Sequence, residues 1–377
     1  MALQASGPIS ASQIRNEFAG DTQVSFSQYF RHAEPTDGLE DFSVTYTSAN
    51  NSGVPTSGAI KFSDFYSKYR EVMFKVGSVN VRENANTSNL FSTYWATNVP
   101  KRLKNNGTIG ATSTANVALT VSSGISNTLV IDNIGSIQGA GGAAGTASVT
   151  ENVRNGGTGG TAIRLDSFCS INNTGTIYGG GGGGGAGTKG GTGGNGANGS
   201  VAGSSGSTCE PDGGCQLFYN LQGGIGAGCC VISVNVVGRT AYYNNPATPT
   251  TGGTGGTGGD GGNGGVGAGY GQTATNAPAL DTTGGPVTAP ALNTTGGPTS
   301  GGGGTATAGS VGGNGGIGGN GVGFGSTGGN GTQGGTGTNG NPGVTPVGIG
   351  GAAGYYLFNS RNVSWIAQGT TAGRIEN

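Results

Sequence analysis

The sequence has 377 residues, of which 87 are glycine, and only 9% of its residues are charged. The low charge argues against charge-driven disorder, and a hydrophobic content of 32% argues against one large apolar core. A net charge of −1 excludes electrostatic attraction to nucleic acid or to an anionic membrane as the basis of function.

Residues 1–70 have the composition of an ordinary globular module and are rich in aromatic side chains. Two segments, 6–14 and 57–65, share the outline Ser-Gly-x-Ile followed by serine. In each, a short extended piece leads to a serine N-cap, which predicts helices over 12–18 and 63–69. We interpret this region as an attachment module, and the aromatic side chains expected to dock it onto a partner are Phe26, Tyr29, Phe30, Phe62, Phe65 and Tyr66.

Residues 71–137 change to a β pattern, with predicted strands at 72–76, 117–121 and 128–131. The sequence of 131–142 recurs in outline at 171–182, and residues 105–110 share its core. In each copy a short strand and an Asn-rich turn lead into glycine. Repetition of this kind predicts stacked units and not a catalytic pocket.

Residues 138–354 are dominated by glycine at every third position. The segment 252–266 consists of uninterrupted Gly-Gly-x triplets, and 312–320 and 181–199 hold the same frame. A period of three matches neither an α-helix nor a strand, but it matches an extended left-handed helix of about three residues per turn. We therefore predict stacked polyglycine II helices joined by backbone hydrogen bonds, with the third residue pointing outward or lining a seam. The alternatives are a disordered glycine-rich linker and collagen, and the near absence of proline from the triplets argues against collagen.

Segments of different composition interrupt the glycine runs at 200–224, 240–251 and 268–300, and the last contains a near-exact duplication of 277–286 at 289–298. Long loops on a rigid scaffold are a common way to build a binding surface. The aromatic side chains predicted to anchor a receptor are Phe218, Tyr219, Tyr242, Tyr243, Tyr270 and Phe324. The alternative for each is packing against the ends of the glycine helices.

The residue patterns of common enzyme and metal sites are missing from the sequence. The single histidine, His32, has no Gly-x-Ser-x-Gly motif beside it, and Lys189 is followed by glycine, so the phosphate-loop pattern fails. The carboxylates beyond residue 160 that a glycosidase pair would need are sparse, the main ones being Asp166, Glu210, Asp212, Asp260 and Asp281. The five cysteines do not form a disulfide framework or a metal-binding pattern. We predict no enzyme activity, no cofactor and no metal.

Residues 355–377 regain a normal composition and predict two strands around 359–362. No apolar stretch reaches the 18 residues of a membrane span and no signal peptide is evident, which predicts synthesis in the cytoplasm without membrane insertion.

The segments 3–10 and 57–66 resemble the opening of tailed-phage tail and fibre proteins, and 359–370 resembles a recurrent ending of such proteins. The glycine blocks are similar to those of the receptor-recognising adhesins at the tips of T-even-like phage long tail fibres. That resemblance implies a virion protein built on a polyglycine II sandwich. It also implies that loops between the glycine runs contact a host outer-membrane protein or surface glycan.

The predicted organisation is therefore an attachment module at 1–70 and a β-rich connection at 71–137, followed by a glycine sandwich at 138–354 and closing strands at 355–377. The partners expected are a phage tail or fibre protein and a host receptor, with a homo-oligomer left open. One alternative is a tail component in which the glycine sandwich is only a rigid spacer. Another is an antifreeze-like binder, which the mixed residues at the third triplet position argue against.

Overall fold

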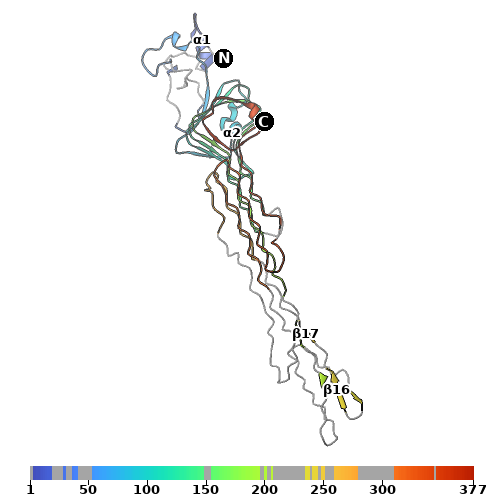
Figure 1. Ribbon diagram of the computed structural model, residues 1–377. Coiled ribbons are helices and arrows are strands. Elements are labelled where there is room, and N and C mark those ends of the chain that lie inside the picture. Colours follow the sequence, from blue (N-terminus) through green and yellow to red (C-terminus); the bar gives the residue numbers. More distant parts are fainter. Residues whose placement is uncertain are drawn as a thin grey trace.

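The computed structural model describes residues 3–18, 29–30, 36–40, 53–147, 154–195, 199–201, 205–206, 234–237, 240–244, 248–250, 259–278, 310–343 and 345–377. These residues are mostly strand and extended chain with a few short helices, which confirms the predicted β-rich, irregular fold class. The molecule is elongated (Figure 1): the N-terminus lies at one end, and strands β16 (Thr240–Asn244) and β17 (Thr248–Thr250) lie at the other.

Near the N-terminal end, three sheets wrap into a solenoid in which the chain passes through each sheet in turn. The first sheet has the order β1-β2-β5-β8-β11-β19, and apart from the antiparallel β1 its strands are parallel. Its strands are β1 (Gly38–Glu40), β2 (Val72–Val76), β5 (Lys101–Asn105), β8 (Leu129–Asn133), β11 (Cys169–Asn173) and β19 (Val363–Ala367).

The other two sheets of the solenoid are also parallel, in the orders β20-β12-β9-β6-β3 and β21-β18-β10-β7-β4. The former consists of β3 (Val81–Glu83), β6 (Thr108–Gly110), β9 (Ser136–Gln138), β12 (Thr176–Tyr178) and β20 (Thr370–Ala372). The latter consists of β4 (Ala85–Asn86), β7 (Val117–Val121), β10 (Thr161–Leu165), β18 (Tyr355–Phe358) and β21 (Arg374–Ile375). The described chain thus makes five coils.

Alternation along each strand fills the inside of the solenoid with stacked aliphatic side chains. In β5, β8 and β11 every second residue is buried, and Leu103, Ile131 and Ile171 lie in register. The sequence repeat corresponds to this stacking, because the copies at 131–142 and 171–182 form strands that pair with each other in neighbouring coils. The prediction of stacked units is confirmed.

Asparagine side chains form a ladder at the corner that follows the first sheet. Asn105, Asn133 and Asn173 end three successive strands, and all three are fully buried. Asn105 Nδ2 donates to Asn133 Oδ1 at 2.7 Å, and Asn133 Nδ2 donates to Asn173 Oδ1 at 2.7 Å. The Asn-rich turns seen in the sequence are therefore a row of hydrogen-bonded buried amides that fixes the register of the coils. At the end of the row that faces Val76 of the first coil, Asn105 Oδ1 is buried without a hydrogen-bond partner.

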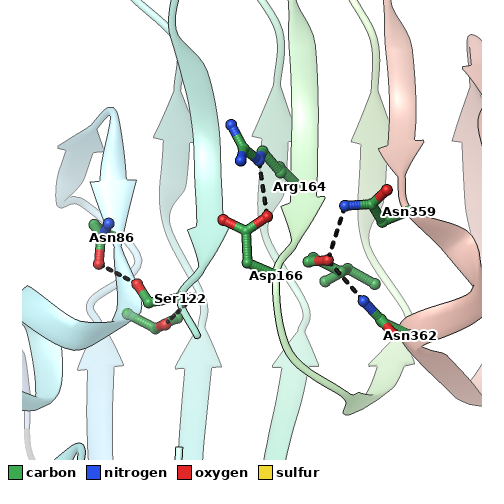
Figure 2. Close-up of polar contacts among 8 residues, drawn as sticks. Asn86, Ser122, Arg164, Asp166, Asn359 and Asn362 are labelled. Carbon is green, nitrogen blue, oxygen red and sulfur yellow. Dashed lines mark hydrogen bonds and ion pairs between the residues drawn. The ribbon is translucent and has the colours of Figure 1, made fainter. Parts of the chain in front are cut away.

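At the corner after the third sheet, side chains tie the turns together (Figure 2). Asn359 Nδ2, just before the short 3₁₀ helix η5 (Ser360–Asn362), and Asn362 Nδ2, at its end, both donate to the carbonyl oxygen of Leu165, at 3.2 and 2.9 Å. Arg164 and Asp166 form an ion pair at 2.9 Å on the preceding turn. These bonds join the C-terminal strands, predicted correctly from the sequence, to coils that lie far earlier in the chain.

The first coil is closed by α2 (Thr87–Phe91) and the 3₁₀ helix η4 (Ser92–Tyr94), which bring the buried Phe91 and Trp95 against the solenoid core. Lys101 follows this turn and is also fully buried. Its Nζ donates to the carbonyl oxygens of Thr97 and Val99, each at 2.8 Å. Burial lowers the pKa of Lys101 to about 8.

Because of Lys101, we expect the free energy of unfolding of the protein to increase as the pH becomes alkaline. Its folded pKa lies below the value of about 10.4 expected in the unfolded chain, so between these values the unfolded chain binds more protons and stability rises with pH. Relative to Lys101→Met, the free energy of unfolding of the natural protein should rise by ~1–3 kcal/mol from pH 7.5 to 10.5. Urea unfolding at both pH values measures this, and a constant difference between the two proteins would contradict it.

The described residues of the N-terminal region include the α-helix α1 (Ala11–Phe18) and the 3₁₀ helix η3 (Phe62–Phe65). The first predicted helix is confirmed, with Ser10 as its cap: Gln13 N donates to Ser10 Oγ, and Ser10 N donates to Gln13 Oε1. The predicted helix over 63–69 is wrong. The chain there forms only a 3₁₀ turn, because Ser67 takes a positive φ of 60° that a helix cannot accommodate.

The glycine-rich region leaves the solenoid as two insertions at the same corner. One separates β9 from β10, and the other separates β12 from β18. The described parts of both form extended segments that run side by side away from the solenoid (Figure 1). Neighbouring segments are joined by backbone hydrogen bonds at every third residue, such as Gly181, Gly184 and Gly187 donating to Ala268, Gly265 and Gly262.

Segment 179–195 is the centre of this glycine bundle. Its successive donors Gly180, Gly181 and Gly182 bond to three different segments, and its carbonyl groups accept from three others. Around it, each segment bonds to the next in the order 139–147, 154–160, 345–354, 326–338, 310–323, 259–268 and back to 139–147. Six neighbours around one chain is the packing that a helix with three edges per turn permits.

The central position explains the longest glycine run in the sequence. Residues 179–185 are all glycine, whereas the surrounding segments carry another residue at every third position. A Cβ on Gly182, Gly183 or Gly184 would overlap the backbone of three different neighbours. Segments of the ring have one free edge, so Ile317 and Ile349 project from them into solvent.

Polar side chains at the third positions satisfy backbone donors along the seams between ring segments. Asn330 Oδ1 accepts from Gly350 N at 2.8 Å, and Thr332 Oγ1 accepts from Ile317 N at 2.7 Å. Asn263 Oδ1 accepts from Ala147 N at 2.8 Å in the same way. These three residues line seams, whereas Ile317 and Ile349 point outward, and the left-handed helical twist of the segments stays a prediction.

Candidate recognition surface and its support

Described strands from two of the segments that interrupt the glycine runs, 200–224 and 240–251, lie at the far end of the bundle from the solenoid. The central segment begins directly after β12, and at ~3.1 Å per residue its 17 residues span about 50 Å. Beyond it lie two small antiparallel sheets (Figure 1). One pairs β13 (Gly199–Val201) with β17, and the other has the order β14-β16-β15, with β14 (Ser205–Gly206) and β15 (Val234–Val237).

Two of the predicted receptor anchors are in this distal part. Tyr242 and Tyr243 lie in β16, the central strand of the three-stranded sheet, in register with Asn235 and Val234. Phe218 and Tyr219 lie outside the described residues.

Tyr270 lies instead at the solenoid end of the bundle. It belongs to a tight turn in which Gly269 pairs with Gln272, and its hydroxyl donates to Glu83 Oε1 at 3.0 Å. Its ring occupies the space over Gly110, where a Cβ would overlap the ring carbons. Partial burial and, secondarily, the Glu83 carboxylate raise the pKa of Tyr270.

Phe324 also lies at the solenoid end, in the turn that joins segments 310–323 and 326–338. Its ring packs against that of Tyr178 in β12, with centroids 5.2 Å apart. The structure therefore does not bring the described predicted anchors together: two are distal, and two pack where the bundle meets the solenoid. The sequence feature that could have indicated turns at Tyr270 and Phe324 is the glycine that follows each of them. These glycines, Gly271 and Gly325, both have a positive φ, which marks a turn.

The aromatic residues predicted to attach the N-terminal module divide by burial. Tyr29 and Phe65 are fully buried and form a core with Ile14, Phe18 and Val54. Phe30 and Tyr66 are half-buried, and Phe62 is 41% exposed. Phe26 lies outside the described residues. The surface that this module offers to a partner therefore includes Phe62 but not the side chains of Tyr29 or Phe65.

The described residues contain no cluster of three or more side chains suited to a metal ion. Among the acidic residues noted in the sequence, Asp166 is paired with Arg164, and Asp260 lies 3.7 Å from Lys189 at an exposed position. Burial raises the pKa of the Cys169 thiol to about 12, so it is protonated and unreactive at neutral pH. His32, Glu210, Asp212, Asp281 and the other four cysteines lie outside the described residues.

Of the helices in the described part of the chain, none has the length and apolar character needed to cross a bilayer.

Comparison with protein families gives a match to the phage tail fibre adhesin Gp38 over residues 71–283. This range is more than half of the chain and includes the first three solenoid coils, two strands of the fourth and the central glycine segment. The chain belongs to this family. It is a phage tail-fibre adhesin, a component of the virion tail, and members of this family are adhesins and not in general enzymes.

Among solved structures, the adhesin is similar to a chain in the crystal structure of the gp37–gp38 adhesin tip complex of the bacteriophage S16 long tail fibre. The two are 18% identical, the comparison covers 99% of each chain, and the TM-score is 0.34. No curated protein sequence gives a significant match.

Proposed function

We propose that this adhesin recognises a host cell-surface receptor, an outer-membrane protein or a surface glycan, through the segments at the distal end of its glycine bundle. The observation that carries the proposal is position. The strands β13 to β17 are held about 50 Å from the solenoid by a bundle whose central chain is hydrogen-bonded to six neighbours. A hydrogen-bonded support that carries segments of different composition at its tip is suited to reaching past the virion to a cell surface.

The other end of the molecule carries the attachment part of the proposal. The described residues before 71 lie at the end of the molecule opposite the distal strands, and Phe62 is an exposed aromatic side chain there. We propose that this module contacts a tail or fibre protein. The glycine bundle is then a polyglycine II scaffold that separates the attachment surface from the recognition surface.

The proposal is tested by replacing distal residues 240–250 with a Gly-Ser sequence of equal length in the full chain. A matched control replaces 279–289, which follow Pro278, because Ala277 N is anchored to Asn320 Oδ1 in the bundle. We expect the distal variant to lose adsorption of labelled protein to host cells by at least ~10-fold and to lose competition with phage infection. The control variant should retain at least part of both.

The spacer alternative predicts different results. If the natural protein neither adsorbs to cells nor competes with phage, the glycine bundle serves only to extend the fibre. If adsorption survives the distal replacement but is lost in the 279–289 variant, recognition depends on residues 279–289 and not on 240–250. Deletion of 1–70 should leave adsorption of the free protein intact and remove it from assembled particles.

A further inference from the structure

Two turns of the glycine bundle contact the solenoid without being continuous with its strands. The first, at Gly269–Gln272, follows segment 259–268, and the second, at Phe324–Gly325, joins segments 310–323 and 326–338. The segments that continue solenoid strands directly are 139–147, 154–160, 179–195 and 345–354. Within the described residues, the remaining ring segments therefore meet the solenoid through these turns alone.

The first turn is held on coils one and two. The Tyr270 hydroxyl donates to Glu83 in β3, and the Tyr270 ring lies over Gly110 in β6. Two further hydrogen bonds hold this turn. Tyr270 N donates to Gly139 O at 3.0 Å, and the side-chain oxygen Gln272 Oε1 accepts from Gly141 N at 3.1 Å. Glycine at position 110 is required by the ring and not by backbone conformation, since its φ is not positive.

The second turn is held on coils four and five. Phe324 packs on Tyr178 in β12, and Gly325 N donates to Gly179 O at 2.9 Å. Gly325 has a φ of +67°, and a Cβ there would overlap Ala372 and Gly373 beside β20. This turn is thus fitted closely against the opposite end of the same sheet.

The two contacts are separated along the sheet β20-β12-β9-β6-β3. Strands β3 and β12 are three strand spacings apart, which is about 14 Å. Two contacts at that separation resist tilting of the bundle along the solenoid axis. Because the bundle is about 50 Å long, a tilt of only ~5° would move its distal end by about 4 Å.

We propose that Tyr270 and Phe324 are positioning residues that clamp the glycine bundle at a fixed angle on the solenoid, so that the distal recognition surface is presented in one orientation. This inference rests on the proposed adhesin function for its consequence, but the clamp itself is a property of the fold. It assigns to these two aromatics a role different from receptor contact.

The test uses the full chain and four changes: Tyr270→Ala, Gly110→Ala, Glu83→Ala and Phe324→Ala. Phe168→Ala is the matched control, because Phe168 is a 59% exposed aromatic on the solenoid. The angle between solenoid and bundle is measured on single molecules by negative-stain electron microscopy. We expect the clamp variants, but not the control, to broaden the angle distribution, with the combination of Tyr270→Ala and Phe324→Ala broadest.

A double-mutant comparison separates clamping from general damage. Gly110→Ala acts by displacing the Tyr270 ring, so it should broaden the angle in the natural protein and add little in Tyr270→Ala. Tyr270→Phe keeps the ring and loses only the hydroxyl bond to Glu83, so it should restore most of the narrow distribution. Thermal melting of each variant confirms that the comparison is made between folded proteins, and Glu83→Ala, which alters an exposed side chain, serves if Tyr270→Ala does not fold.

Adsorption distinguishes this inference from the proposed function. Free clamp variants should bind host cells within about twofold of the natural protein, while particles carrying them should adsorb ~3–10-fold more slowly because docking depends on orientation. An unchanged angle distribution in Tyr270→Ala and Phe324→Ala would overturn the clamp. Loss of free-protein adsorption with an unchanged angle would instead make these residues receptor contacts. If the natural protein does not adsorb at all, the proposed function fails, and the angle measurement still decides the clamp.

Discussion

Gly183→Ala is expected to destabilise the glycine bundle by ~3 kcal/mol or more, an unusually large effect for the addition of one methyl group. Gly183 lies in the central segment, donates to Gly157 O and accepts from Gly351 N. A Cβ at this position would overlap the carbonyl oxygen of Ala143. A backbone neighbour cannot rotate away as a side chain can, so a whole segment must shift and its row of hydrogen bonds must lengthen.

The matched control is Gly335→Ala in a ring segment. Gly335 makes the same kind of backbone bonds, but the nearest atoms to a Cβ there are 3.6 Å away, on Asn314. Because Ala reduces the freedom of the unfolded chain, this change should be neutral or stabilise by ~0.4–1 kcal/mol. Chemical unfolding and amide hydrogen exchange of the bundle measure both variants. Equal stability of the two would contradict a central position for 179–195.

Asn133→Ala is the second change with a large expected effect, a loss of about 3–5 kcal/mol in the free energy of unfolding of the solenoid. Asn133 accepts from Asn105 and donates to Asn173 Oδ1 and to Thr176 O, at 2.7 and 3.1 Å. Its removal leaves these buried groups without their partners and adds a cavity. Denaturant unfolding followed by circular dichroism measures the loss.

Two comparisons make the ladder prediction specific. Asn172→Ala removes a neighbouring amide that faces outward and bonds to Asp132, and it should cost under about 1 kcal/mol. Simultaneous replacement of Asn105, Asn133 and Asn173 by valine should recover part of the stability lost by Asn133→Ala, because Val76 fills the equivalent register position in the first coil. A triple variant less stable than Asn133→Ala would contradict the pairing argument.

Two features of the fold, the extended glycine segments and the stacked strand repeats, can be predicted from the sequence. Glycine at every third position predicts extended segments that are joined by a backbone hydrogen bond at every third residue. Neighbouring backbones can approach this closely only where no Cβ lies between them. The recurrence of 131–142 at 171–182 predicts stacked units, and the bonded rows of Ile131 with Ile171 are those units. These features are local or repeat at a fixed spacing, so they can be read without knowing the fold.

The attachment and recognition residues were harder to place from the sequence. The aromatic character of Tyr29, Phe65, Tyr242 and Tyr270 predicts interface anchors, because aromatic side chains bury much surface at such sites. The same property makes them good core and clamp residues, and burial is what separates the roles. Tyr29 and Phe65 are in a core, and Tyr270 lies over a glycine in another part of the molecule.

By itself, the sequence determined the strand repeats, the glycine frame and the family resemblance, because each depends on residue type and spacing alone. Tertiary structure decided that Ile171 pairs with Trp365 across the whole glycine-rich insertion, so that both ends of 71–377 form one solenoid. It also decided which glycine segment is central and which aromatics meet the solenoid. These outcomes depend on contacts between residues far apart in the chain, and no local pattern specifies which distant backbone a glycine will face.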